Sequence, residues 1–143
     1  MPFPELDSYK KKDQEVARLL TDLEAYLTEI LNRPPLEAST FYNSSAHDIN
    51  PLWVARKLGI SKQRAYALLY ICDEAGIITP RFDVYCPETE EFLASFPSSQ
   101  ALPLKIECEF HDFIVEHEID EYLIQLFFQF SPNIIGRAFK LAV

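Results

Sequence analysis

Glycine and long apolar runs are both scarce in this chain. It has 3 Gly and 10 Pro among 143 residues, which excludes collagen-like and flexible-linker compositions. No apolar run reaches the roughly 18 residues that a membrane span requires. Residues 1–7 lack the charged-then-apolar pattern of a secretory signal. We therefore expect a cytoplasmic protein without a membrane partner.

Cysteine is also sparse, and the motifs of several enzyme classes are missing. Cys72, Cys86 and Cys108 are an odd number of thiols, which cannot form a closed disulfide set and which fits a reducing compartment. The sequence has no Gly-rich phosphate loop, no His-Glu-x-x-His and no nucleophile elbow. Acidic pairs such as Glu116 and Glu118 are typical of polar strand faces. We expect no enzymatic activity, no catalytic residue, no cofactor and no small-molecule substrate.

Positive charge is in deficit, mainly in the C-terminal part. The chain has 13 Lys/Arg against 22 Asp/Glu, a net charge of −9. Residues 1–80 carry 9 Lys/Arg and 11 Asp/Glu, a balance of −2, whereas residues 81–143 carry 4 and 11, a balance of −7. Phosphate neutralisation supplies most of the non-specific affinity for nucleic acid. The charge balance therefore disfavours generic nucleic-acid binding.

What the chain does contain is enough apolar sequence for a core, at 48% hydrophobic residues. Residues 1–11 have the features of a loose leader. From Asp13 to Leu31 the apolar residues recur at spacings of three and one, which traces one stripe of an amphipathic helix ended by a Pro-Pro pair. The stripe fits packing on its own domain, with a partner helix or a second copy as the alternative. The polar segment that follows should contain a short helix or strand near residues 36–42.

Strong boundary signals then predict two short helices within residues 50–76. Asn50 is typical of a helix N-cap, and Gly59 of a left-handed helix end. Ser61 predicts the start of a second helix, which Gly76 closes. We predict a positive φ at Gly76, followed at once by a strand.

After residue 80 the apolar period changes from 3.6 to 2, which predicts strands. They are expected at about residues 82–86, 92–96, 104–110, 114–119 and 123–130. The first two should form a hairpin, and the later three a small appended antiparallel β subdomain. The expected fold class is α+β. We divide the chain into 1–96, the N-terminal amphipathic helix with the helix-turn-helix and its hairpin; 97–131, the small β subdomain; and 132–143, an apolar C-terminal tail.

The segment NPLWVARKLGISKQRAYALLYICDEAGIIT resembles the helix-turn-helix core of the winged-helix superfamily. The pattern is Leu-Gly-Ile-Ser before the recognition helix and Ala-Gly-Ile-Ile after it, within 30 of the 143 residues. The resemblance implies a winged helix-turn-helix over residues 50–96, and winged helices both read DNA and dock proteins. The order of parts also resembles small accessory subunits of prokaryotic multi-component systems, including antiviral defence systems.

If this winged helix reads DNA, the start of its second helix enters the major groove. Arg and Lys pair with guanine edges and Gln with adenine. The candidate nucleic-acid-binding residues are Arg56, Lys57, Lys62, Gln63, Arg64 and Tyr66. Against this use, Glu88, Glu90 and Glu91 lie at the tip of the predicted hairpin, where other wings carry cations.

Two tetrads resemble the knuckles of a degenerate zinc ribbon. They are Cys86-Pro87-Glu88-Thr89 and Cys108-Glu109-Phe110-His111. A zinc ribbon has Cys-x-x-Cys at both places, and Thr89 stands where the first tetrad needs its second ligand, although His117 could substitute. The alternative is that both cysteines are ordinary buried strand residues. We expect no metal ligands and no stoichiometric zinc, with Cys86, Cys108 and His111 as the first ligands to test.

Protein docking is the function that these features favour most. The candidate partner-binding residues are Leu20, Leu23, Leu27, Phe127, Ile135, Phe139 and Leu141. We expect a non-enzymatic adaptor or regulatory subunit that docks onto protein partners in a homo- or hetero-oligomer, with nucleic acid as an optional component. The alternative is a DNA-binding transcriptional regulator. Under the adaptor hypothesis, Lys62→Ala with Arg64→Ala leaves complex formation intact, and removal of residues 134–143 weakens it.

Overall fold

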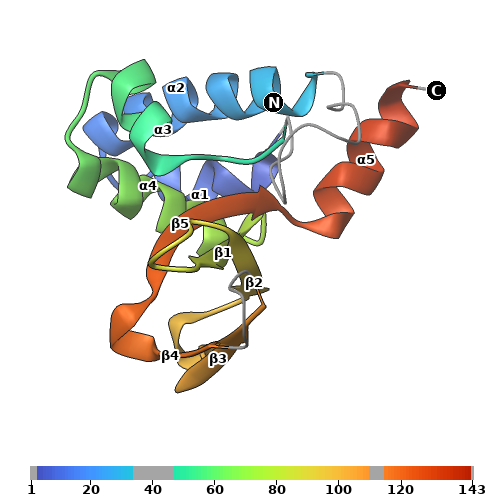
Figure 1. Ribbon diagram of the computed structural model, residues 1–143. Coiled ribbons are helices and arrows are strands. Elements are labelled where there is room, and N and C mark those ends of the chain that lie inside the picture. Colours follow the sequence, from blue (N-terminus) through green and yellow to red (C-terminus); the bar gives the residue numbers. More distant parts are fainter. Residues whose placement is uncertain (1–2, 34–46, 110–114, 143) are drawn as a thin grey trace.

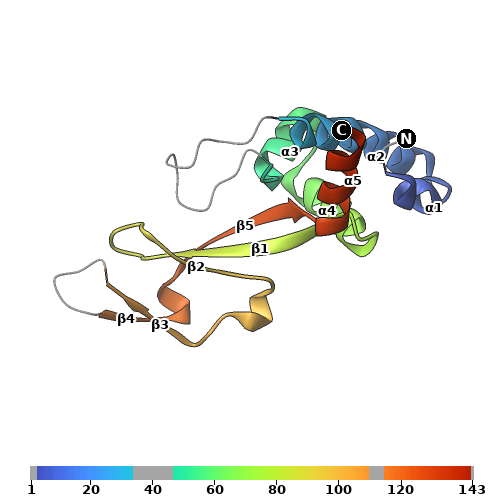
Figure 2. The ribbon, with the colours of Figure 1, turned by 90° about the vertical axis from the view of Figure 1, so that its right-hand side faces the viewer.

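A layer of helices lies against an antiparallel sheet in this protein, and a short hairpin lies at the far end of the sheet (Figures 1 and 2). The structure is a computed structural model that describes residues 3–33, 47–109 and 115–142, with side chains described up to residue 137. It confirms the α+β class. The short element predicted near residues 36–42 lies outside the described residues.

The helical layer is built mainly from three α-helices, with short turns before them and one helix after the strands. Their bounds are η1 Pro4–Leu6, α1 Asp7–Lys10, α2 Gln14–Leu31, α3 Pro51–Leu58, α4 Lys62–Glu74 and α5 Pro132–Ala142. The expectation of a loose leader is wrong. Phe3 and Leu6 are buried in the core, so two apolar anchors hold this segment although it lacks helical periodicity.

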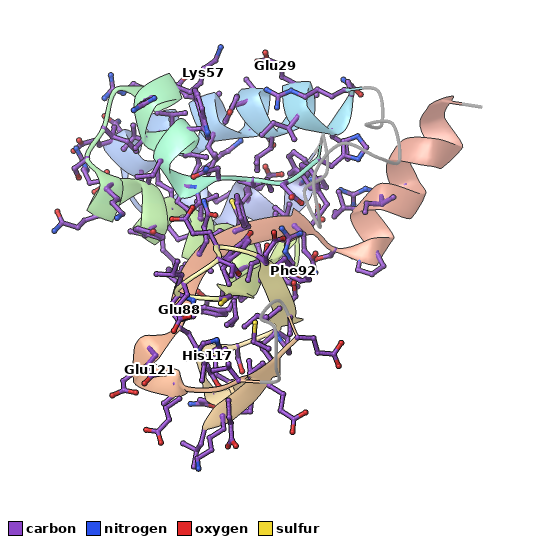
Figure 3. The ribbon with its side chains drawn as sticks, in the orientation of Figure 1. Glu29, Lys57, Glu88, Phe92, His117 and Glu121 are labelled. Atoms are coloured by element: carbon purple, nitrogen blue, oxygen red, sulfur yellow. The ribbon has the colours of Figure 1, made fainter. Side chains whose placement is uncertain are left out.

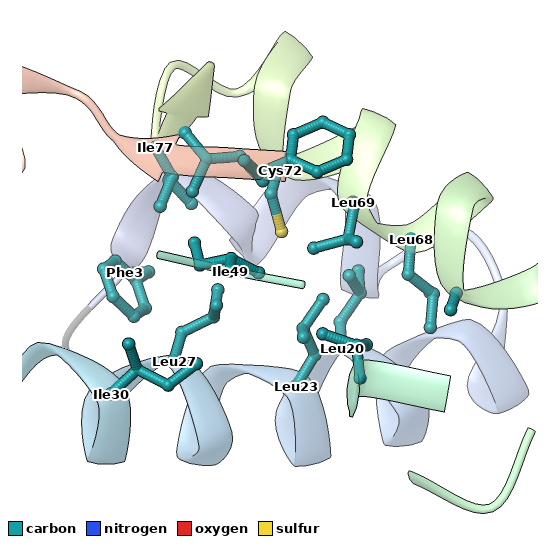
Figure 4. Packing of buried hydrophobic residues seen from close by; sticks show 14 of the residues in the cluster. Phe3, Leu20, Leu23, Leu27, Ile30, Ile49, Leu68, Leu69, Cys72 and Ile77 are labelled. Carbon is teal, nitrogen blue, oxygen red and sulfur yellow. The ribbon is translucent and has the colours of Figure 1, made fainter. Parts of the chain in front are cut away.

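Helix α2 begins where the sequence predicts. The Asp13 side chain caps it by accepting hydrogen bonds from the backbone N–H groups of Glu15 and Val16, at 2.8 and 3.1 Å. Its apolar stripe faces inward and lines the main core beside α4, as the close-up in Figure 4 shows. The long helix therefore packs on its own chain.

The two predicted short helices are α3 and α4, and their boundaries follow the expected signals. Asn50 Oδ1 accepts from the Leu52 N–H at 2.9 Å, and Ser61 Oγ accepts from the Arg64 N–H at 3.2 Å. Gly59 has φ +66°, and α4 ends before Gly76, which has φ +82°. The predicted positive φ at Gly76 is confirmed.

Five strands follow, close to the predicted ranges. They are β1 Ile78–Tyr85, β2 Phe92–Phe96, β3 Lys105–Cys108, β4 Val115–Glu118 and β5 Leu123–Phe130. They form a three-stranded sheet in the order β2-β1-β5 and a separate two-stranded sheet, β3-β4. The β1–β2 hairpin is as predicted, with Phe82 opposite Phe96.

The pairing of β5 differs from the prediction. This strand was assigned to the appended subdomain, but it pairs with β1 along its whole length, from Ile78 opposite Phe130 to Tyr85 opposite Leu123. A subdomain of residues 97–131 would therefore divide the larger sheet. Among the strands of the described residues, β3 and β4 are the ones outside that sheet. The prediction failed because strand pairing depends on residues distant in sequence, which alternation does not reveal.

The C-terminal segment, expected to be an apolar tail, is helix α5. Ile134 is buried against the main core, and Arg137 lies 3.2 Å from Glu5. Removing residues 134–143 would thus remove part of the core, so that deletion tests folding and not docking alone. Among the helices of the described ranges, none combines the length and the apolar character of a membrane span.

Candidate functional sites

The proposed nucleic-acid residues lie together on the helix-turn-helix. Arg56 and Lys57 lie in the last turn of α3, and Lys62, Gln63 and Arg64 form the first turn of α4. All five are exposed, whereas Tyr66 is half-buried. The sequence therefore located a real surface cluster.

Carboxylates from α2 lie beside two of these cations. Arg64 Nη2 is 2.6 Å from Glu15 Oε1. Lys57 Nζ is 3.7 Å from Glu29 Oε2, and both of these residues are labelled in Figure 3. Exposed pairs of this kind contribute little to stability. Their effect on the surface is larger, because each carboxylate lowers the positive potential that a phosphate backbone would meet.

The remaining two cations lie over aromatic rings. The Arg56 guanidinium is 5.3 Å from the centre of the Trp53 ring, and Lys62 Nζ is 5.8 Å from that of Tyr66. Trp53 is 57% exposed, a large apolar surface on α3. Sequence analysis missed Trp53, although Val54 and Ala55 mark the inward face of α3 and leave the tryptophan pointing outward.

The proposed partner-binding residues are mostly not at the surface. Leu20, Leu23 and Leu27 are fully buried in the protein's own core, so they cannot contact a partner in this fold. The apolar stripe of α2 correctly indicated that these leucines are buried. It did not show whether they pack on the protein's own core or on a partner. The half-buried Ile135 packs on the same core.

The other proposed anchors are on β5 and α5. Phe127 is half-buried, with its ring centre 5.2 Å from the Arg81 guanidinium. Phe139 and Leu141 belong to α5, and their side chains lie beyond the described ones.

A different apolar surface lies at the start of β5. Leu123 and Ile124, the first two residues of this strand, are 41% and 45% exposed. An open groove of about 390 Å³ is lined by Tyr85, Glu90, Leu123, Ile124 and Gln125. We call these five residues the β5 groove. The alternation that predicted this strand does not show that Leu123 and Ile124 are exposed, so the groove was not among the predicted sites.

The two predicted knuckle cysteines meet a histidine. Cys86, Cys108 and His117 are all buried, and their ligand atoms lie within 4.8 Å of one another. Cys86 Sγ is 3.4 Å from His117 Nε2. We call these three residues the Cys–His cluster. His111, the sequence candidate, lies outside the described residues.

Two further groups orient the Cys–His cluster. The Thr89 N–H donates to Cys86 Sγ at 3.5 Å. His117 Nδ1 is 3.7 Å from Glu121 Oε2 (Figure 3), whereas the other ring nitrogen, Nε2, lies toward Cys86. Glu121 is itself held, because it accepts from the Glu118 N–H at 3.2 Å.

The third cysteine has a different environment. Cys72 lies on α4 in the main core, among apolar side chains (Figure 4). Burial, together with the charge of the nearby Glu24 carboxylate, raises the pKa of its thiol to about 12. Cys72 is therefore a protonated core residue at neutral pH.

Comparison of the chain with protein-family models, with curated proteins and with solved structures yields no match. Arguments about function therefore depend on the geometry of these surfaces.

Proposed function

We propose that this protein is a non-enzymatic adaptor that uses a winged helix-turn-helix as scaffold and docks onto a protein partner through the β5 groove. The observation that carries the proposal is the exposure of Leu123 and Ile124 on neighbouring positions of one strand. Large apolar side chains at a groove are typical anchors of protein interfaces.

The winged-helix assignment is supported by the order of elements. Helix α3, a turn with Gly59 at positive φ, helix α4 and the β1–β2 hairpin follow one another directly. The hairpin takes the position of a wing, but its turn is acidic. We propose that this scaffold serves docking in a reducing compartment such as the cytoplasm, since Cys72, Cys86 and Cys108 form no disulfide bond with one another.

Charge defines the chemistry of the partner. Glu90 lines the β5 groove, and residues 81–143 carry a balance of −7. An apolar segment flanked by Lys or Arg therefore complements the groove better than an acidic segment does. The same charge repels a DNA backbone.

The alternative, a regulator that reads DNA through α4, has support from the exposed Lys62, Gln63 and Arg64. Glu15 and Glu29 interrupt the positive surface beside them. The continuous basic face across α4 and the hairpin that DNA reading favours is therefore interrupted by Glu15 beside Arg64, and the hairpin turn itself is acidic. We accordingly give docking precedence over DNA reading.

The two functions are separated by surface substitutions in the full chain. Leu123→Thr with Ile124→Thr removes the anchors while keeping residues compatible with a strand end. Lys62→Ala with Arg64→Ala removes the cations, and Leu104→Thr is a matched control because Leu104 is an exposed leucine, at 76%, outside the β5 groove. Each variant is used to capture proteins from lysate of the source cells, quantified by mass spectrometry.

The adaptor proposal predicts that one protein is captured by the wild type, by Leu104→Thr and by the double alanine variant. The amount of this protein that the β5 groove variant captures should fall about tenfold or more, because each buried anchor contributes more than about 1 kcal/mol. If instead the purified chain binds a specific duplex with a steep salt dependence, and the double alanine change abolishes this, the regulator function replaces the adaptor.

A further inference from the structure

The β3–β4 hairpin has little apolar material to hold it in place. Of the eight residues in the two strands, the buried ones are Cys108 and His117. The outward face is charged and exposed, with Lys105, Glu107, Glu116 and Glu118. A two-stranded hairpin is marginally stable by itself in water. Ile106 and Val115 on the same face are only half-buried, so Cys108 and His117 are the strand residues that the rest of the protein covers fully.

Both buried residues point to the same place. Ile106 pairs with His117 and Cys108 with Val115, so Cys108 and His117 share one face of the hairpin. That face meets Cys86, which directly follows β1 of the larger sheet. The Cys–His cluster is therefore the point where the two sheets are joined.

The distances suit a tetrahedral metal ion. With bonds of about 2.3 Å to sulfur and about 2.0–2.1 Å to nitrogen, tetrahedral ligand atoms lie roughly 3.5–3.8 Å apart. Cys86 Sγ and His117 Nε2 are already 3.4 Å apart, and all three ligand atoms lie within 4.8 Å. Side-chain rotations that move these ligand atoms by about 1 Å bring all three within bonding distance of one ion.

The groups around the Cys–His cluster contact its side chains in the way that protein groups orient the ligands of a metal ion. The Glu121 carboxylate lies beside Nδ1 of His117, which directs Nε2 toward the cysteines. The Thr89 N–H points at Cys86 Sγ, and such a donor stabilises a thiolate. Thr89, whose side chain broke the sequence pattern, thus contributes through its backbone, and His117 supplies the nitrogen ligand.

We propose that Cys86, Cys108 and His117 bind one Zn²⁺ ion, which fastens the β3–β4 hairpin to the end of β1. Two sulfurs and one imidazole are a borderline-soft donor set that suits zinc and not Mg²⁺ or Ca²⁺. Binding converts two thiols to thiolates and releases two protons to solvent, with no change of oxidation state. This reverses the expectation of no zinc, which rested on the tetrad pattern alone.

The test uses the full chain without an affinity tag, because a His tag binds metals. The protein is produced in zinc-supplemented medium, and its zinc is measured by mass spectrometry. We expect about one zinc per chain in the wild type and in Cys72→Ala, a matched buried cysteine outside the cluster. Cys108→Ala and His117→Ala should each retain about tenfold less.

A second measurement guards against variants that fail to fold. The wild type, stripped of zinc, is titrated with Co²⁺ and followed by absorption spectroscopy. Zinc binding by the Cys–His cluster predicts an intense thiolate-to-cobalt charge-transfer band and tetrahedral d–d bands, both lost on adding Zn²⁺. A zinc-free wild type that stays folded and gives no such band overturns the proposal. So does an equal loss of zinc from Cys72→Ala and Cys108→Ala.

Discussion

The main core and the β3–β4 hairpin differ in the kind of side chain that holds each of them. The core combines buried leucines, isoleucines and aromatics from η1, α2, α4 and the larger sheet. The hairpin buries a thiol and an imidazole from its strands, against a second thiol. Hydrophobic burial therefore explains the stability of the first region, whereas the proposed zinc ion would give the second a specific cross-link.

This difference predicts that the two regions can be destabilised separately. Loss of apolar volume should weaken the core, which joins helices and sheet in one packed unit. Loss of the metal or its supporting groups should release the hairpin and leave the core folded.

Leu23→Ala should lower the free energy of unfolding by about 2–5 kcal/mol, because it leaves a cavity beneath α2. Urea unfolding followed by circular dichroism measures the change. Leu52→Ala is the control, since Leu52 is half-exposed on α3 and should cost well under about 1 kcal/mol. Equal losses for the two variants would show that α2 does not pack as described.

Glu121→Gln should weaken Zn²⁺ binding about 10- to 100-fold, because the carboxylate beside His117 Nδ1 is lost. Competition with a chromophoric chelator measures the affinity. Glu107→Gln removes one carboxylate from the exposed face of the same hairpin and should change the affinity little. An unchanged Zn²⁺ affinity in Glu121→Gln would show that Glu121 does not position His117.

Gly76→Ala should destabilise the protein by about 1–2 kcal/mol, because φ is +82° at this position. An added Cβ would meet no atom within 4 Å, so the cost comes from the backbone alone. At Gly136 in α5 an added Cβ also meets no atom within 4 Å, so Gly136→Ala should stabilise the protein by up to about 1 kcal/mol. The midpoint temperatures of thermal unfolding of the two variants should shift in opposite directions. Shifts in the same direction would contradict the role of Gly76 at the end of α4.

The Arg64–Glu15 pair should contribute least. Both side chains are more than half exposed, so a double-mutant cycle with alanine should give a coupling of about 0.2–1 kcal/mol. Raising the salt concentration should reduce the coupling further. A coupling well above this range, measured from urea unfolding, would mean that the pair is shielded from solvent.

Local signals in the sequence were sufficient for most of the secondary structure. Asn50, Gly59, Ser61 and Gly76 each mark a helix boundary through chemistry that acts within a few residues. The strands followed from alternation in the same way. The N-terminal segment was missed, because Phe3 and Leu6 are too few to show a period.

Pairing between distant segments was not predictable from the same signals. The alternation of apolar residues along β5 would be the same beside β4 or beside β1. In the structure this strand pairs with β1. For the same reason the apolar stripe of α2 could not distinguish its own core from a partner. Leu20, Leu23 and Leu27 were thus proposed as anchors while Leu123 and Ile124 were missed.

The Cys–His cluster was partly predictable. The sequence singled out Cys86 and Cys108, and it indicated that Glu116 and Glu118 belong to a polar strand face. Alternation along the strand puts His117 on the inward side with Val115, which was the signal available for the third ligand. What the sequence could not show is that β1 and the hairpin meet at this point.

Residue-resolved hydrogen exchange of the full chain, with zinc bound and after chelation, tests most directly whether the two regions are held differently. We predict that chelation lowers the protection of amides at 105–108 and 115–118 about tenfold or more, because binding stabilises the state that holds the metal. Amides in the middle of α2 should keep their protection. Equal losses in both regions, or no change in the hairpin, would contradict this account.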